Sequence, residues 1–204
     1  MKELSSDSSQ EFQFLLETIK SYAEIGDDTW RALQSISRIK DVSKGQEIVS
    51  LGEKSDAIYF VCKGIFLAYV LGGDQGEREV VKNFFDEGRF PASITSMLKN
   101  EESNFCMVAL EDSVVIEMNF KGYRKILKEK DDFKWFHIQY IERHWLLERE
   151  PQELSLLNDE GVARYLNFLE QYPGVIDRVP LYNVASRIGV TPTQLSRIRS
   201  KLKR

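Results

Sequence analysis

The sequence predicts an α+β protein in which a domain of antiparallel strands lies between helical parts of the chain. Residues 39–119 break into short β-rich segments separated by glycines, a pattern typical of a jelly-roll-like sandwich or barrel. Apolar residues recur at helical spacing on both sides of this region. The last twenty-seven residues hold seven basic and no acidic side chains, whereas the rest holds 21 basic and 32 acidic ones. We therefore expect two domains, and the basic tail indicates a polyanionic partner.

The expected elements follow from local patterns. A polar, Ser-rich start precedes two short helices at 11–24 and 28–36. A hairpin tip is expected at 72–76, where glycines cluster. Later helices are expected at 120–128, 131–157 and 160–172. The expected strands are 47–50, 57–61, 65–69, 79–84, 105–109 and 114–118.

The long segment 131–157 carries more aromatic side chains than an exposed helix should show, so part of it should pack on a partner subunit. Pro151 removes one backbone hydrogen bond and clashes with the carbonyl four residues earlier. We therefore expect a kink or break between Leu147 and Pro151. Asn158 or Asp159 should cap the helix that follows.

Composition excludes several classes of protein. No apolar run approaches the roughly 20 residues of a membrane helix, and the polar N-terminus is not a signal peptide. Cys62 and Cys106 are isolated, which favours buried free thiols in a cytoplasmic protein. With His137 and His144 as the only histidines, we expect no metal and no cofactor of known type. No catalytic constellation is evident, so an enzyme is not expected.

Residues 181–200 fit a helix-turn-helix. Ala185 supplies the small fifth residue where the two helices approach, and Gly189 supplies the ninth, where the chain turns left-handed. Thr191 should cap the second helix, with Pro192 in its first turn. Apolar residues stand where the helices should touch, namely Val184, Ile188, Val190, Leu195 and Ile198. This unit inside a basic tail indicates double-stranded DNA as the partner.

The second helix, over 191–203, should enter the major groove with its N-terminal residues nearest the bases. Outward positions Thr193, Gln194 and Arg197 are the expected base contacts, since Gln can pair bidentately with adenine and Arg with guanine. Other polar positions should contact phosphates. The predicted DNA-binding set is Thr191, Thr193, Gln194, Ser196, Arg197, Arg199 and Lys201.

The two halves together resemble the CRP/FNR superfamily of bacterial transcription regulators. The resemblance rests on DVSKGQEIVSLGEKSDAIYFVCKGIFLAYV (41–70), RYLNFLEQYPGVIDRVP (164–180) and VASRIGVTPTQLSRIRSKL (184–202). It implies an antiparallel β-roll of the cyclic nucleotide-binding type, a homodimer joined through a long helix, and DNA as a partner; RNA polymerase is a further candidate partner. Because the sequence stops at Arg204, the family's β-wing is expected to be mostly missing.

These expectations divide the chain into four parts. Residues 1–27 form a polar segment and a helix, and 28–130 form the β-roll. Residues 131–157 form the dimerisation helix, and 158–204 form the DNA-binding domain.

The nucleotide site departs from the family pattern. Nucleotide-binding members carry Gly-Glu, for the ribose hydroxyl, and later Arg-Ser/Thr-Ala, for the phosphate. Here Gly88 is kept, Arg89 replaces the glutamate, and Ser103-Asn104 fall where the phosphate-binding arginine is expected. We therefore expect no tight binding of cAMP or cGMP.

Three hypotheses remain for this pocket. Arg89, together with Ser93, Ser103 and Asn104, could bind another anion or a small metabolite. Alternatively, Arg89 pairs with Asp86 or Glu87 and the roll is purely structural. Redox or haem sensing is the least supported, because residues 1–61 contain no cysteine.

Two other functions compete with the DNA-binding regulator. A cupin-type enzyme needs histidine ligands inside its barrel, and no histidine lies between Ile39 and Asn119. A ligand-sensing or protein-interaction module with the same β-roll would not bind DNA specifically, and the fit at 181–200 weighs against it.

Overall fold

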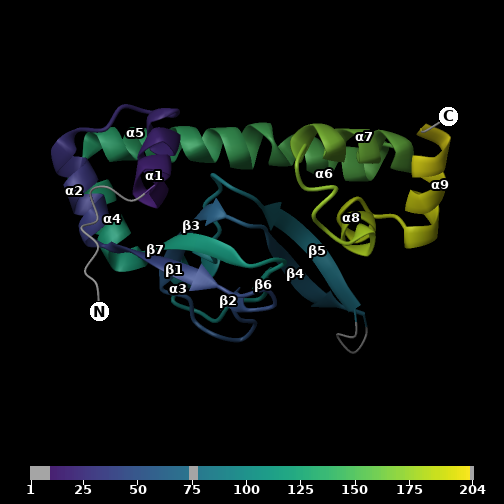
Figure 1. Cartoon of the computed structure of the whole chain (residues 1–204), viewed down its shortest axis with the longest axis horizontal. Helices are drawn as coiled ribbons and strands as arrows, with labels where there is room; N and C mark the ends of the chain where they lie inside the picture. Colours follow the sequence, from purple (N-terminus) through teal and green to yellow (C-terminus); the bar gives the residue numbers. More distant parts are fainter. Residues whose placement is uncertain (1–9, 74–77, 203–204) are drawn as a thin grey trace. The chain divides into compact units, whose positions relative to one another are not determined.

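The structure is a computed structural model of the 204-residue chain, and it describes residues 10–73 and 78–202 (Figure 1). The chain forms two compact units. The first contains the chain up to Ala68 together with Phe84–Tyr140, and the second contains Tyr69–Asn83 together with the chain from Ile141 onward. Most of the hairpin tip predicted at 72–76 lies outside the described residues.

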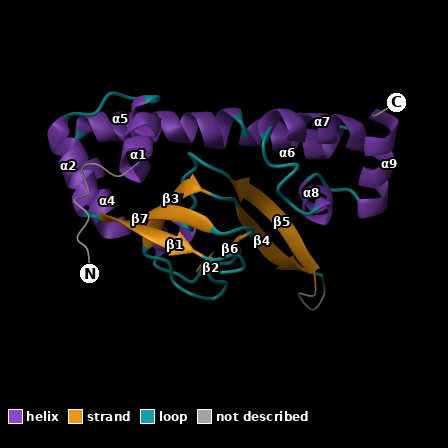
Figure 2. Cartoon of the chain, in the orientation of Figure 1, coloured by secondary structure: helices purple, strands orange, loops and turns teal. Residues whose placement is uncertain are grey.

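The strands form two antiparallel layers (Figure 2). One sheet has the order β1-β7-β3 and the other has the order β2-β6-β4-β5. The predicted α+β class with an antiparallel β-sandwich is therefore confirmed. The strands are β1 (Ser37–Val42), β2 (Glu47–Val49), β3 (Ala57–Lys63), β4 (Phe66–Gly72), β5 (Arg78–Phe85), β6 (Cys106–Ala109) and β7 (Ser113–Asn119).

Two elements were not among those expected from the sequence, namely β1 and the short helix α3 (Ile94–Lys99). Strand β1 is polar because it lies at the edge of its sheet, beside β7. Its Arg38 and Lys40 both pair with the Glu117 carboxylate on β7. Cross-strand ion pairs thus replace the apolar alternation by which a strand is usually predicted.

The first unit has a core formed by helices against the β1-β7-β3 sheet. The helices are α1 (Gln10–Lys20), α2 (Asp27–Ser35), α4 (Phe120–Glu129) and α5 (Asp131–Ile141). Aromatic rings fill much of it: the ring centroids of Phe60 and Phe90 lie 4.9 Å apart, and those of Phe90 and Tyr140 lie 5.0 Å apart. Such tilted and edge-on contacts add to the burial of apolar area.

The predicted interruption before Pro151 is present, but it starts earlier and takes another form. After α5 the chain continues as a π-helix, η1 (Glu142–Leu147), before α6 (Arg149–Asn158). The Glu148 N–H donates to the carbonyl of Arg143, five residues back, at 3.1 Å. A widened turn of this kind absorbs a disturbance in the helical hydrogen bonds without ending the helix.

The second unit contains α6, α7 (Gly161–Gln171), α8 (Leu181–Arg187) and α9 (Pro192–Leu202). The cap expected from Asn158 or Asp159 is wrong. Glu160 is the N-cap of α7 and makes no side-chain capping bond, while the Asp159 carboxylate accepts a hydrogen bond from Ser155. The buried residues of the four helices and their connections include Tyr165, Phe168, Tyr172, Val175, Val184, Ala185, Ile188 and Leu195.

Within the described part of the chain, no helix is long and apolar enough to cross a membrane.

Candidate nucleic-acid interface

The helices α8 and α9 form the predicted helix-turn-helix. Gly189 has a φ of +67°, the left-handed conformation expected for it. The Val190 N–H donates to the carbonyl of Ala185 at 3.0 Å, which closes the turn. Val184, Ala185 and Leu195 are buried between the helices. The apolar spacing therefore fixes the angle at which α9 leaves the turn.

Helix α7 packs against α9 and the turn before it (Figure 1). A Cβ atom added to Gly161 would lie 3.1 Å from a methyl group of Val190 and 3.3 Å from one of Ile198. Arg164 on α7 donates to the backbone carbonyl of Asp159 at 3.2 Å and to that of Gly189 at 3.4 Å. The turn before α9 is thus held by packing and by hydrogen bonds.

The first turn of α9 is closed by a reciprocal pair of hydrogen bonds between Thr191 and Gln194. The Gln194 N–H donates to Thr191 Oγ1 at 3.2 Å, and the Thr191 N–H donates to Gln194 Oε1 at 2.8 Å. This is a capping box, which satisfies two backbone donors at the start of a helix. Thr191 is the predicted cap, whereas the hydrogen bond from its N–H to Gln194 was not predicted. The Thr-x-x-Gln spacing could have revealed it.

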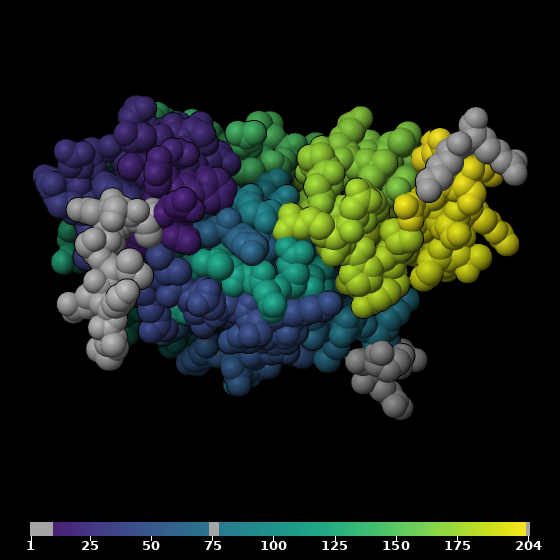
Figure 3. All heavy atoms as spheres, viewed as in Figure 1, coloured from purple at the N-terminus to yellow at the C-terminus, as the bar shows by residue number. Residues whose placement is uncertain are grey.

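Six of the seven predicted DNA-binding residues lie on α9, the helix drawn in yellow in Figure 3, and Thr191 directly precedes it. Arg199 is half-buried and the other six are exposed. Within the described ranges, the side chains of Arg197, Arg199 and Lys201 make no hydrogen bond or ion pair. The last twenty-seven residues contain no acidic side chain that could pair with them locally.

Within the second unit, two hydrogen bonds connect strand β5 with the helical segments. The backbone N–H of Val81 donates to Ser186 Oγ on α8 at 3.0 Å. The hydroxyl of Tyr172, which follows α7, donates to Asn83 Oδ1 at 2.6 Å. Sequence reasoning missed these contacts, since no local pattern connects positions about 90 to 105 residues apart.

The residues predicted for an effector pocket make two different sets of contacts. In the first group, Gly88 has a φ of +82° and its N–H donates to the carbonyl of Val61 at 2.9 Å. Arg89 follows, and its Nε lies 3.7 Å from Asp86 Oδ1. The Glu87 carboxylate accepts from the N–H of Gly64 at 2.8 Å. Arg89 therefore has a local carboxylate partner.

The second group is a pair of buried hydroxyls. The Oγ atoms of Ser93 and Ser103 lie 3.0 Å apart, and Ser103 also donates to the carbonyl of Phe105 at 2.8 Å. Both side chains are almost completely buried, whereas Asn104 is exposed. The hydroxyls thus satisfy each other and the backbone.

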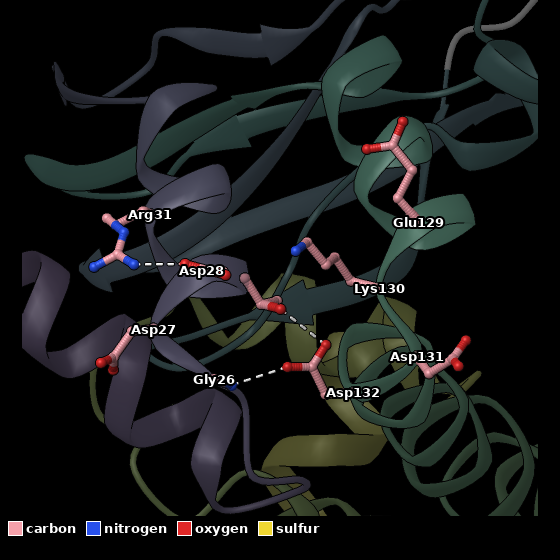
Figure 4. A pocket seen from close by; sticks show the side chains of 9 residues that line it. Gly26, Asp27, Asp28, Arg31, Glu129, Lys130, Asp131 and Asp132 are labelled. Atoms are coloured by element: carbon pink, nitrogen blue, oxygen red, sulfur yellow. Dashed lines mark hydrogen bonds and ion pairs between the residues drawn. The ribbon is translucent and has the colours of Figure 1, made fainter.

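A shallow polar pocket of about 530 Å³, largely open to solvent, lies at the start of α2 and the junction of α4 with α5 (Figure 4). Asp132 there accepts from the Gly26 N–H and from the Thr29 hydroxyl, each at 2.9 Å. Partial burial alone would raise the pKa of Asp132, but these bonds and one from the Phe133 N–H hold it below its ordinary value. No group of three or more His, Cys, Asp or Glu side chains in the described part of the chain is arranged to hold a metal ion.

Comparisons with known proteins agree with this architecture. The sequence model of the cyclic nucleotide-binding domain family matches residues 39–130. No curated protein sequence matches the chain. Among solved structures, the c-di-GMP responsive global regulator CLP from Xanthomonas campestris has a TM-score of 0.66 at 14% identity. The match covers 87% of this chain and 92% of CLP.

Two further structures have the same fold. FixK2 from Bradyrhizobium japonicum matches with a TM-score of 0.66 at 17% identity, covering 82% of this chain and 85% of FixK2. DNR from Pseudomonas aeruginosa matches with a TM-score of 0.57 at 19% identity, covering 96% of this chain and 88% of DNR. The chain therefore has the fold of these solved regulators, and residues 39–130 match the cyclic nucleotide-binding domain family. The predicted resemblance is confirmed as a fold.

Proposed function

We propose that the chain is a homodimeric, sequence-specific DNA-binding transcription regulator of the CRP/FNR type that does not respond to cAMP or cGMP. The observation that carries the proposal is the surface of α9. It is exposed and contains no acid, and its cationic side chains have no partner among the residues that the structure describes. It belongs to a helix-turn-helix whose turn and first helix are well packed. A helix presented in this way fits the major groove, and unpaired cations attract phosphates.

Dimerisation through residues 131–157 is supported by exposed apolar side chains in both units. In the first unit, Trp135 on α5 is 60% exposed. In the second unit, Leu147 at the end of η1 is 73% exposed and Leu157 on α6 is 81% exposed. Large apolar side chains gathered on one segment are typical of a subunit interface. In such a dimer the two copies of α9 would contact half-sites about one helical turn apart.

The proposed lack of a response to cyclic nucleotides is supported by the contacts that Arg89 and Ser103 make within the chain. A nucleotide phosphate would have to compete with the Asp86 carboxylate for Arg89, and the ribose would find no glutamate acceptor at this position. The hydroxyl of Ser103, where the family has its phosphate-binding residues, is already used by Ser93 and the Phe105 carbonyl. These contacts favour the hypothesis of a structural roll over that of an anion site.

The DNA-binding proposal is tested by fluorescence anisotropy with an operator selected from random duplex and with an unrelated duplex. Arg197→Ala should weaken operator binding roughly 5- to 150-fold, which is the range for losing one good base contact. Lys201→Ala should weaken both duplexes alike and reduce the salt slope by about 0.9, since it removes one phosphate contact. Lys121→Ala, an exposed cation on α4, serves as the control and should change neither. Equal affinities for all four proteins would contradict the proposal.

The dimer is tested by analytical ultracentrifugation. Leu147→Asp should dissociate it, because a charge would be buried in the interface. The control is Leu98→Asp on α3, an exposed leucine outside the helical segment, which should remain dimeric. A monomeric wild-type chain would refute this part of the proposal.

A further inference from the structure

The side-chain amide of Gln194 has a fixed orientation. A backbone N–H can only donate, so the amide atom that lies 2.8 Å from the Thr191 nitrogen is the carbonyl oxygen, Oε1. The amide nitrogen, Nε2, therefore points away from the cap. Gln194 is exposed, and among the described residues Nε2 has no hydrogen-bond acceptor. The side chain thus offers two free N–H donors to a ligand.

We propose that Gln194 determines sequence specificity as a hydrogen-bond donor and selects guanine in the operator, in place of the bidentate contact with adenine predicted from the sequence. The inference rests on the proposed DNA-binding function. It concerns which base edge a capped glutamine can recognise.

The difference between the two purines follows from their major-groove edges. Guanine presents two acceptors, N7 and O6, which suit two N–H donors on one nitrogen. Adenine presents an acceptor beside the N6 amino donor, so a bidentate contact needs both Oε1 and Nε2 on the base. Turning Oε1 fully toward adenine would release the Thr191 N–H and open the capping box.

Arg197 lies three residues further along α9, on the same face of the helix. It has no partner in the described part of the chain, and its guanidinium also suits the two acceptors of guanine. The half-site should therefore contain two nearby G·C pairs. One would depend on Gln194 and the other on Arg197.

The sharpest variant is Gln194→Glu, which is nearly isosteric. Its carboxylate can still accept from the Thr191 N–H, so the capping box survives, but it offers no donor. A carboxylate accepts from the N4 amino group of cytosine. At one position of the operator the preference should therefore reverse from G·C to C·G. Gln194→Ala should lose the preference there, and Arg197→Ala should lose it at a different position.

The experiment is selection of half-sites from a random duplex library by the full-length chain. Competition binding at fixed salt follows, and the result is expressed as a ratio between duplexes that differ in one base pair. The wild type should prefer guanine at the Gln194-dependent position about five-fold or more. Because the readout is a ratio, the negative charge added by Gln194→Glu affects both duplexes alike. A thermal melt confirms that each variant is folded, and Gln194→Glu decides the outcome if Gln194→Ala does not fold.

Two results would overturn the inference while leaving the proposed function intact. One is a wild-type preference for adenine that Gln194→Ala abolishes. The other is an unchanged set of preferred bases in Gln194→Glu. If the wild type binds no duplex even at low salt, the proposed function fails and the inference fails with it.

Discussion

Asp132 holds together two segments that lie more than one hundred positions apart in the sequence. Its carboxylate accepts from the Gly26 N–H at the start of α2 and from the hydroxyl of the buried Thr29 (Figure 4). In Asp132→Ala the exposed Gly26 N–H would lose its carboxylate acceptor, and the loss of such a hydrogen bond costs about 1 kcal/mol. The Thr29 hydroxyl would be left buried without an acceptor, at about 1–2 kcal/mol. We therefore expect the free energy of unfolding to fall by about 2–3 kcal/mol at pH 7.

The pH dependence provides the second half of this test. The hydrogen bonds hold the pKa of Asp132 below its ordinary value, so the carboxylate is favoured in the folded state. Its contribution is therefore complete above the unfolded-state pKa of about 3.9 and is lost as the pH falls through the folded-state pKa. The difference between wild type and Asp132→Ala in urea unfolding should shrink as the pH is lowered from 7 toward 3.

The neighbouring Asp131 offers a matched control. Its side chain is 94% exposed and its ion pair with Lys134 lies on the surface. Asp131→Ala should change the free energy of unfolding by less than about 1 kcal/mol, since exposed pairs contribute little. The reasoning is refuted if the two variants lose equal stability, or if the loss in Asp132→Ala does not depend on pH.

Three further predictions concern stability and reactivity. Leu195→Ala should lower the free energy of unfolding by about 2–5 kcal/mol in urea titrations, because the side chain is almost fully buried. Leu202→Ala is the control, since Leu202 is 47% exposed, and it should lower the free energy of unfolding much less. Equal losses would contradict the packing of α9. Gly64→Ala should severely destabilise the chain in thermal melts, because the added Cβ would lie 2.0 Å from Ser113 Oγ at a φ of +107°. In Gly174→Ala the added Cβ would meet no described heavy atom within 4 Å apart from Gly174 and its chain neighbours, so this variant should stay within about 0.5 kcal/mol of wild type. Similar losses for both variants would be inconsistent with this backbone. Burial raises the pKa of Cys62 to about 12. At pH 8, iodoacetamide should therefore alkylate this thiol much more slowly in the folded chain than in urea. Equal rates of alkylation would show that the Cys62 thiolate is accessible in the folded chain.

Sequence reasoning succeeded where a local pattern determines the structure. The spacing of Val184, Ala185, Gly189 and Leu195 leaves few alternatives to two short helices with a left-handed turn, and the structure has this arrangement. The glycine-punctuated strands likewise indicated an antiparallel sandwich. Sequence reasoning missed β1, because ion pairs there replace the apolar periodicity of a typical strand. It also predicted the wrong cap for α7, because Asp159, one of two adjacent candidates, bonds to Ser155 instead.

The candidate site was likewise predictable from the sequence only in part. The sequence identified the exposed residues of α9, but it could not show that the carbonyl of Gln194 is committed to the Thr191 N–H. Nor could it distinguish a pocket in which Arg89 is free from one in which Asp86 is its partner. Both questions depend on where side-chain atoms come to lie, and several rotamers are compatible with the same sequence pattern.

The sequence by itself thus determined the class of fold, the position of the helix-turn-helix and the concentration of positive charge at the end of the chain. These follow from the periodicity and composition of neighbouring residues, which act over a few positions. Only the tertiary structure decided that Asp132 accepts from the Gly26 N–H at the start of α2, that β5 contacts α8 through Ser186, and which atoms of α9 are free to contact a ligand. The physical reason is that hydrogen bonds between distant segments form only after packing has brought their donors and acceptors within about 3 Å.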